Sequence, residues 1–522
     1  MNPIPIVDLF AGPGGLGEGF SSLRHQDGKR VFKIAISAEM ESSAHRTLTL
    51  RAYYRQFLNP SEVPQDYFDY IACPATDKIR RTALKQKLEQ SKEWKAAVDE
   101  AFQLTLGDPE DNRRLESLIT ERISDKNIRD WILVGGPPCQ AYSLVGRARN
   151  SGNEDYSAET DGRHFLYQEY LKIIEKFQPA VFIMENVKGI LSSKVGDKRM
   201  FSEILNDLSA PLNSSKGVAT RYRLYSVTND VFFEHGMSTE DIDFRKFTVK
   251  SEEHGVPQKR HRVFIIGVRL DVDESKPIRL PLLETGHSSE VTVEDVIGDL
   301  PALRSGLSKT SDTFDAWNKC ILAFLDEIKS QRPDFVQKIE KIKKTIKTRK
   351  TELRRKSSAI SSTDAFDSAI MDWISDPALS SLSNHETRGH MEMDLARYLF
   401  CSIFATQSGE NRSPKAKDFP HFLAPEHANW QSGKFADRFR VQLADKPATT
   451  ITSHISKDGH YFIHPDPSQC RSLTVREAAR IQTFPDNYFF EGNRTQQYVQ
   501  VGNAVPPFLA MKIARGVKEL LG

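Results

Sequence analysis

Short runs of apolar and β-branched residues recur along the first half of the chain, and charged amphipathic stretches separate them. Six runs have the length and composition of buried strands, and they cover residues 4–10, 33–38, 131–134, 180–184, 222–227 and 262–268. Strands that alternate with helices are typical of a doubly wound α/β sheet, which binds ligands at the carboxyl ends of its strands. The pattern therefore predicts this fold, with functional residues just after the strands.

The rest of the chain departs from this alternation in two places. Residues from about 75 to 128 are charged and helical in pattern, which predicts a helical insertion. After residue 269 the alternation fades, and order returns near residue 471 before a helix predicted over 507–521. We expect one domain over residues 1–299, a second, smaller domain over 300–445, and a return to the first over 446–522.

Composition limits the class of protein. A chain of 522 residues with 39% hydrophobic and 27% charged residues is typical of a globular protein with two domains. No apolar run is long enough to span a bilayer, and the amino terminus lacks the features of a signal peptide, so we expect no membrane partner and a cytoplasmic location. Five cysteines without a CxxC pair predict neither disulfides nor a metal site.

The net charge of +2 does not by itself predict a nucleic-acid partner. The distribution of charge says more, because residues 338–356 hold ten Lys or Arg and two Glu. Ile339, Ile342 and Ile346 recur there at helical spacing. The charges are therefore either phosphate contacts or the solvated face of a helix, and the sequence leaves both open.

A glycine-rich segment over residues 8–20 follows the first predicted strand and begins a predicted helix. Gly12, Gly14 and Gly17 match GxGxxG, and Glu39 ends the next strand, where a carboxylate can accept hydrogen bonds from ribose hydroxyls. Alone, this pattern fits a nicotinamide cofactor nearly as well as S-adenosylmethionine, and it also fits a tight turn without a ligand.

Two further strands end in chemically useful side chains. Residues 132–143 form a buried strand that runs into a loop of two glycines, two prolines and Cys139. A lone cysteine is usually a small buried apolar residue, but at the end of a strand in a stiff loop it is a candidate nucleophile. Glu185 ends the next strand, where it is either a helix cap or a proton donor with a raised pKa.

Six segments stand in a characteristic order: DLFAGPGG, GGPPCQAYS, MENV, QKRHRVFIIG, RSLTVREAARIQTFP and QVGNAVP. Together they resemble the motif series of the DNA (cytosine-5) methyltransferases, in particular the bacterial C5-cytosine methylases. The resemblance covers most of the chain except the helical insertion and the middle of the region after residue 269. It implies a class I S-adenosylmethionine-dependent methyltransferase sheet and a target-recognition domain over 300–445.

The resemblance also implies a mechanism. Such enzymes flip the target cytosine out of the duplex, because carbon 5 is inaccessible within the stack. Cys139 is then expected to attack carbon 6 while Glu185 hydrogen-bonds or protonates nitrogen 3. Arg262 is expected to support the flipped base and Arg260 to help hold the site, with both side chains on one face of the strand.

For the cosubstrate, S-adenosylmethionine, the resemblance implies that Phe10 packs on the adenine and that Asn503 and Ala504 close over the methionine part. Asp108 is the candidate for the adenine amino group. Met40 stands where many members have tryptophan, which predicts a different packing on the adenine. The full expected cofactor set is Phe10, Ala11, Gly12, Gly14, Leu16, Glu39, Met40, Asp108, Pro137, Asn503 and Ala504.

The resemblance implies a monomer that acts on double-stranded DNA, in a restriction-modification or related defence system, with a cognate restriction endonuclease or other defence components as candidate partners. Three alternatives stay open at this stage. These are a transfer-RNA cytosine-5 methyltransferase, a nicotinamide-dependent oxidoreductase and a non-catalytic DNA-binding regulator. The long interval after residue 269 argues against the first, since relatives that act on RNA are compact there.

Overall fold

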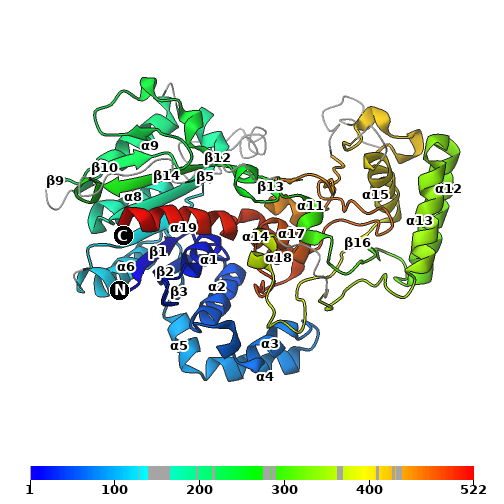
Figure 1. Cartoon of the computed structure of the whole chain (residues 1–522), viewed down its shortest axis with the longest axis horizontal. Helices are drawn as coiled ribbons and strands as arrows, with labels where there is room; N and C mark the ends of the chain where they lie inside the picture. Colours follow the sequence, from blue (N-terminus) through cyan, green and yellow to red (C-terminus); the bar gives the residue numbers. More distant parts are fainter. Residues whose placement is uncertain are drawn as a thin grey trace.

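The computed structural model describes residues 2–126, 128–138, 165–195, 198–213, 218–273, 283, 290–360, 368–406, 411–425, 430 and 438–521. Cys139 lies outside the described residues. The main feature is a nine-stranded sheet with the strand order β11-β10-β14-β5-β4-β1-β2-β3, in which β12 pairs with β14. Figure 1 shows this sheet at one end of the molecule.

All six predicted strands are present in this sheet, which confirms the α/β fold. They are β1 (Ile4–Leu9), β2 (Phe32–Glu39), β4 (Ile132–Gly135), β5 (Val181–Val187), β10 (Tyr222–Tyr225) and β14 (His261–Arg269). Strands β1 to β5 run parallel, whereas β14 lies antiparallel between β5 and β10. The sheet is therefore mixed, and its parallel half brings the ends of β1, β2, β4 and β5 to one edge.

Helices cover both faces of the sheet. On one face α1 (Gly15–Ser22) and α19 (Pro507–Leu521) pack against each other and over side chains such as Ile6. On the other face α6 (Pro109–Ile119), α8 (Phe165–Phe177) and α9 (Met200–Ser209) cover side chains such as Val7 and Leu9. The apolar side chains of β1 thus alternate between two cores, as expected for a strand buried on both sides.

The region predicted as a helical insertion is only partly helical. It contains α4 (Lys78–Glu89), α5 (Lys92–Val98), α6 and the π-helical turn η2 (Thr120–Ser124), after α2 (Ser42–Arg55), η1 (Pro60–Glu62) and α3 (Gln65–Ala72). Between α5 and α6 lies β3 (Ala101–Gln103), which pairs in parallel with β2 and forms an edge of the sheet. Three residues are too few to show a strand period, so the sequence pattern missed β3.

Shorter elements fill the connections around the sheet. These are β6 (Lys194–Val195) with β7 (Lys198–Arg199), β8 (Leu212–Asn213) with β9 (Val218–Ala219), β11 (Phe232–Phe233), β12 (Thr248–Lys250), β13 (Gln258–Lys259) with β17 (Ala448–Thr449), α10 (Leu270–Asp273), η4 (Lys188–Ser192), η5 (Thr239–Asp241), η6 (Phe244–Phe247) and η7 (Ser251–His254).

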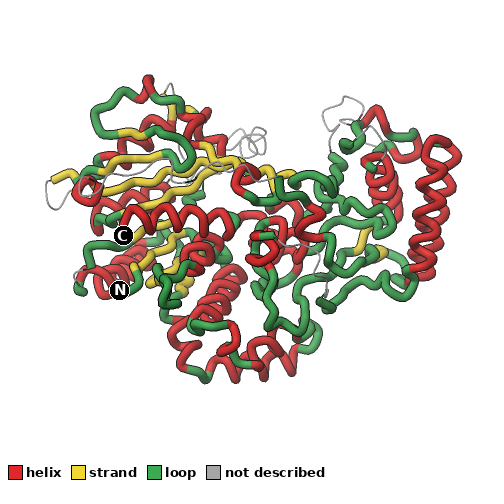
Figure 2. The backbone as a smooth tube through the Cα atoms, viewed as in Figure 1, coloured by secondary structure: helices red, strands yellow, loops and turns green. Residues whose placement is uncertain are grey.

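A second hydrophobic core lies away from the sheet. It is formed by α12 (Phe314–Gln331), α13 (Val336–Thr348) and α15 (Glu392–Ala405), with Trp317, Ile339 and Phe400 fully buried. Figure 1 shows α12 and α13 side by side at the end of the molecule opposite the sheet, and Figure 2 shows long loops between the helices there. The remaining elements of this region are α11 (Val293–Ile297), β15 (Gly306–Leu307) with β16 (Gly389–His390), η8 (Pro333–Phe335), α14 (Ala369–Ile374), η9 (Ala416–Asp418) and η10 (His421–Leu423).

The last part of the chain joins the two ends of the molecule. It contains η11 (Ser453–Ser456), α17 (Val475–Ile481), α18 (Arg494–Asn503) and α19. Helix α14 packs against this part, because Ile374 shares a core with Ile481 and Phe484. One helix of the interval between residues 300 and 445, α14, therefore packs against the last part of the chain and not in the second core. Among the described helices, none is long and apolar enough to cross a membrane.

Candidate active site

The glycine-rich loop connects β1 to α1 at the carboxyl edge of the sheet. Phe10, Gly12 and Gly14 all have positive φ, at 56°, 58° and 98°. A Cβ on Gly14 would lie 2.8 Å from the side chain of Leu48, whereas a Cβ on Gly12 would meet no atom within 4 Å. Gly14 is thus needed for packing and backbone conformation, and Gly12 keeps open space at the edge where a ligand is expected.

Glu39 holds this loop from the neighbouring strand β2. Its Oε2 accepts a hydrogen bond of 2.9 Å from the Gly12 amide, and its Oε1 accepts one of 2.8 Å from the Glu41 amide. Burial raises the pKa of the Glu39 carboxyl. A carboxylate has about four acceptor positions, so Glu39 can accept a further hydrogen bond, and the adjacent Met40 side chain is 58% exposed. A ribose acceptor beside an exposed apolar side chain fits a nucleoside.

The end of the chain supports the same loop. The Tyr488 hydroxyl donates a hydrogen bond to the Pro13 carbonyl, and Gly15 lies against the Val505 carbonyl so closely that a Cβ would overlap it. Asn503, at the end of α18, is exposed, and the Ala504 carbonyl accepts a hydrogen bond from Gln482. The sequence prediction missed Tyr488, although it is the third residue after the motif RSLTVREAARIQTFP.

A buried ion pair lies behind the loop. Arg51 of α2 donates to both carboxylate oxygens of Glu18 on α1, and it also donates a 2.8 Å hydrogen bond to Asn487 Oδ1. Asn487 Nδ2 donates to Asp376 Oδ2 at 2.6 Å and to the Tyr54 hydroxyl at 2.9 Å. These contacts connect the helix after the loop to the segment that follows α14.

Asp8, at the end of β1, is fully buried. Its carboxyl oxygens have no hydrogen-bond partner of normal geometry among the described residues. Burial raises the pKa of Asp8 to about 7, and the nearby Arg55 opposes this shift only in part. Below about pH 7 the folded protein therefore holds Asp8 as the neutral acid.

The candidate catalytic pair comes from two neighbouring antiparallel strands. Glu185 on β5 is opposite Phe264, and Arg262 on β14 is opposite Val187, so both side chains lie at the carboxyl edge. Arg262 Nε is 3.1 Å from Glu185 Oε1. Burial lowers the pKa of Arg262, and the Glu185 carboxylate opposes this shift. An arginine in this position orients the carboxylate and compensates its charge.

The loop that leads to Cys139 begins beside this pair. A Cβ on Gly136 would lie 3.0 Å from Glu185 Oε2, which explains the second glycine of the motif. Asn186 Nδ2 donates a 3.3 Å hydrogen bond to the Pro137 carbonyl, and Pro137 is buried. The described part of the loop thus starts within contact distance of Glu185.

Arg260 is predicted to help hold the site, on the same strand face as Arg262. It lies between β13 and β14 rather than on a strand, and it is buried. Its Nη1 donates to the Ile451 carbonyl at 2.9 Å and to the Gly502 carbonyl at 3.2 Å. Arg260 therefore braces the end of α18 next to Asn503, and both Arg262 and Glu185 are near enough to affect its pKa.

Asp108 is the N-cap residue of α6, and its Oδ1 accepts hydrogen bonds from the amides of Glu110 and Asp111. This helix-capping role was not part of the sequence prediction for Asp108. Ala11 is half-buried in the loop and Leu16 is buried in α1. Among the described residues, no group of three or more His, Cys, Asp or Glu side chains could hold a metal ion.

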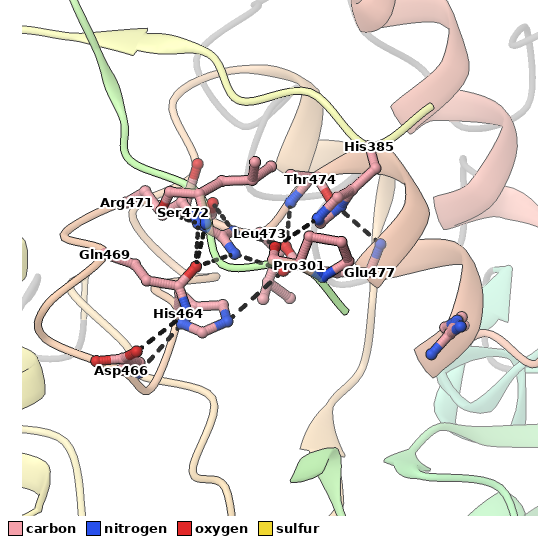
Figure 3. A network of polar contacts seen from close by, with 12 residues as sticks. Pro301, His385, His464, Asp466, Gln469, Arg471, Ser472, Leu473, Thr474 and Glu477 are labelled. Atoms are coloured by element: carbon pink, nitrogen blue, oxygen red, sulfur yellow. Dashed lines mark hydrogen bonds and ion pairs between the residues drawn. The ribbon is translucent and has the colours of Figure 1, made fainter. Parts of the chain in front are cut away.

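A buried polar network joins the region with the second core to the rest of the molecule (Figure 3). At its centre Glu477 of α17 accepts hydrogen bonds from Arg471 at 2.6 and 2.7 Å and from the Thr474 amide at 2.6 Å. His385 contacts the Thr474 hydroxyl at 3.1 Å and the Pro301 carbonyl at 2.9 Å. Burial lowers the pKa of His385 to about 4, so this histidine is neutral near pH 7.

The fold and this edge define a class of protein. The sheet has the features of a class I S-adenosylmethionine-dependent methyltransferase: a glycine-rich loop after β1, an acid at the end of β2, and an antiparallel strand between β5 and β10. Residues 90–211 and 247–519 match the family described as C-5 cytosine-specific DNA methylase. The chain belongs to this family and is therefore a methyltransferase of this kind.

Several known proteins are similar over their whole length. The type II methyltransferase M.Bpa9945I of Bacillus paralicheniformis is 33% identical over 99% of both chains. The type II methyltransferase M.AgeI of Thalassovita gelatinovora is 26% identical over 98% of both chains. A solved structure described as a DNA modification methyltransferase encoded within an E. coli prophage shares the fold, with a TM-score of 0.54, 18% identity and 99% coverage of both chains. These similarities do not favour the RNA and nicotinamide alternatives.

Proposed function

We propose that the protein methylates carbon 5 of a cytosine within a specific sequence of double-stranded DNA, as a monomeric modification enzyme of a type II restriction-modification system. The observation that carries the chemistry is the Arg262–Glu185 pair beside the loop that leads to Cys139. The whole-length similarity to proteins named type II methyltransferases supports the biological role.

The chemistry assigned to the chain's own residues is covalent catalysis. The Cys139 thiolate forms a bond to carbon 6 of the flipped cytosine, and Glu185 donates a proton or hydrogen bond to nitrogen 3. Carbon 5 then becomes nucleophilic and accepts a methyl group. Loss of the carbon 5 proton and departure of the thiolate restore the ring. Arg262 keeps Glu185 oriented through the cycle.

S-adenosylmethionine, when bound, supplies the electrophilic methyl group. The residues that would hold it lie around the glycine-rich loop. Phe10 and Met40 offer apolar surface for the adenine, Glu39 offers the ribose acceptor, and Asn503 lies exposed at the closing loop. The open space at Gly12 and the remaining lone pairs of Glu39 fit such a group.

The decisive experiment compares methyl transfer to genomic duplex DNA and to transfer RNA by the purified protein, with radiolabelled S-adenosylmethionine. Label at carbon 5 of cytosine in DNA is expected, and bisulfite sequencing of DNA from expressing cells should place it in one short sequence. The Cys139→Ala variant should lose this activity and its covalent capture by a 5-fluorocytosine duplex, while it still binds the cosubstrate. Label in RNA alone would overturn the proposal.

A further inference from the structure

The basic segment over residues 338–356 contains both compensated and uncompensated charges. Several of its charged side chains are compensated within the protein. Lys343 pairs with Asp326, Arg349 with Asp466, Lys350 with Asp315, Arg355 with Asp312, and the acid Glu340 with Lys329. These pairs fasten α13 to α12 and to neighbouring loops, so they do not require a ligand.

Three lysines of α13 form the second group. Lys341, Lys344 and Lys347 are exposed, and their side chains form no ion pair or hydrogen bond with any other described residue. They follow one another at a spacing of three residues, which places them on adjacent positions of one helix surface. Uncompensated charges of one sign, held close together, repel one another unless an anion neutralises them.

The helix presents these lysines away from the protein. Ile339, Ile342 and Ile346 are buried in the second core, and with about 100° of rotation per residue the arc of the three lysines lies opposite them. The lysines rise along α13 by roughly 4.5 Å from one to the next. The result is a rigid row of three positive charges over roughly 9 Å, which is long enough to meet two successive phosphates of one DNA strand.

We propose that Lys341, Lys344 and Lys347 bind the phosphate backbone of the duplex outside the recognised sequence. This inference rests on the proposed function, since it takes double-stranded DNA as the partner. The length of the lysine row matches the spacing of phosphates along a DNA strand, and its positive charge is complementary to theirs. Figure 1 places α13 at the far end of the molecule from the sheet. The contact therefore lies far from the reacting base and adds affinity without sequence information.

The test measures how DNA affinity depends on salt. The variant K341Q/K344Q/K347Q keeps helix propensity and a polar side chain at each position, and it removes three charges. Binding to a 60-base-pair duplex is measured by fluorescence anisotropy between about 50 and 200 mM salt. The slope of log affinity against log salt should become shallower by roughly 2 to 3, or about 0.9 for each lost phosphate contact.

A control variant removes the same number of charges elsewhere, at lysines of which two form surface ion pairs, Lys85 with Glu89 and Lys87 with Asp66. The variant K78Q/K85Q/K87Q alters three lysines of α4, which Figure 1 places at a different edge of the molecule. An unchanged slope in the α13 variant, or an equal change in the α4 variant, would overturn the proposal and leave α13 with a solvated face. Methylation at saturating DNA should be unchanged in both variants. Failure of the wild type to methylate DNA would instead contradict the proposed function.

Discussion

Arg262 Nε lies 3.1 Å from Glu185 Oε1, and the two side chains come from adjacent antiparallel strands, β14 and β5. Arg262 lies near the start of the antiparallel strand β14, and Glu185 lies near the end of β5. Because the two strands run in opposite directions, both side chains reach the same edge of the sheet. This geometry ties the proton donor of the proposed reaction to the part of the sheet that departs from a purely parallel order.

The Glu185→Gln variant should lose most of its methyl-transfer rate. An amide keeps the shape of the side chain but cannot donate the acid proton, and the loss of general acid catalysis typically costs about 10² to 10⁴ in rate. Single-turnover methylation measures the rate, and DNA binding should change little. The exposed Glu253 gives a matched control, because Glu253→Gln should leave the rate unchanged. Wild-type turnover in Glu185→Gln would exclude the acid role.

Tyr488→Phe should weaken cosubstrate binding. The variant removes the hydroxyl that donates a hydrogen bond to the Pro13 carbonyl. A buried hydrogen bond of this type contributes about 1 kcal/mol, so we expect the affinity for S-adenosylmethionine to fall about fivefold. Calorimetric titration with S-adenosylmethionine measures the effect. Tyr498→Phe is the control, because it loses a similar bond, to the Leu473 carbonyl, away from the loop. Equal effects in both variants would argue against a specific role for Tyr488.

Asp8→Asn should change how stability depends on pH. The pKa of Asp8 is about 7 in the folded protein against 3.8 for an ordinary aspartate, so the folded state holds an extra proton between these values. The contribution of Asp8 to the free energy of unfolding is therefore fully present below pH 3.8 and is lost as the pH rises to about 7. The total loss is about 4 kcal/mol. Urea unfolding between pH 4 and 8 measures the free energy of unfolding. With rising pH this free energy should fall less in Asp8→Asn than in the wild type, or should increase.

His385→Gln should act in the opposite direction. Burial lowers the pKa of His385 to about 4 from 6.5, so between these values the unfolded chain binds a proton that the folded protein does not. Stability from this group is complete above pH 6.5 and is lost as the pH falls to about 4, by about 3 kcal/mol. As the pH falls from 6.5 to 4, the free energy of unfolding should therefore decrease less in His385→Gln than in the wild type. An unchanged pH profile would show that His385 titrates normally.

Strand pattern alone predicted six strands of the sheet, because each is a buried apolar run with clear limits. It did not predict β3, which is three residues long and forms because β2 leaves an open edge beside it. The antiparallel course of β14 is also absent from the sequence pattern, since a buried strand has the same composition in either direction. Partner strands, rather than local propensity, decide these features.

The candidate site shows the same division. Gly12, Glu39 and Glu185 are predictable because each lies in or shortly after the last residues of a strand, and parallel strands bring such residues to one edge. Arg260 and Tyr488 act through contacts with Ile451 and Pro13, residues far away in the sequence. Such supporting contacts depend on how distant segments pack, so no local motif could reveal them. The cap formed by Asp108 depends on where α6 begins, which the pattern fixes only approximately.

The contact between Gly15 and Val505 has a consequence for the order of folding. Hundreds of residues separate the two in the sequence, so the glycine-rich loop reaches its final packing only after the segment that carries Val505 has docked on it. Contacts between such distant parts of a chain cost the most loop-closure entropy and form slowly. We therefore expect the loop to become ordered in one of the last steps of folding.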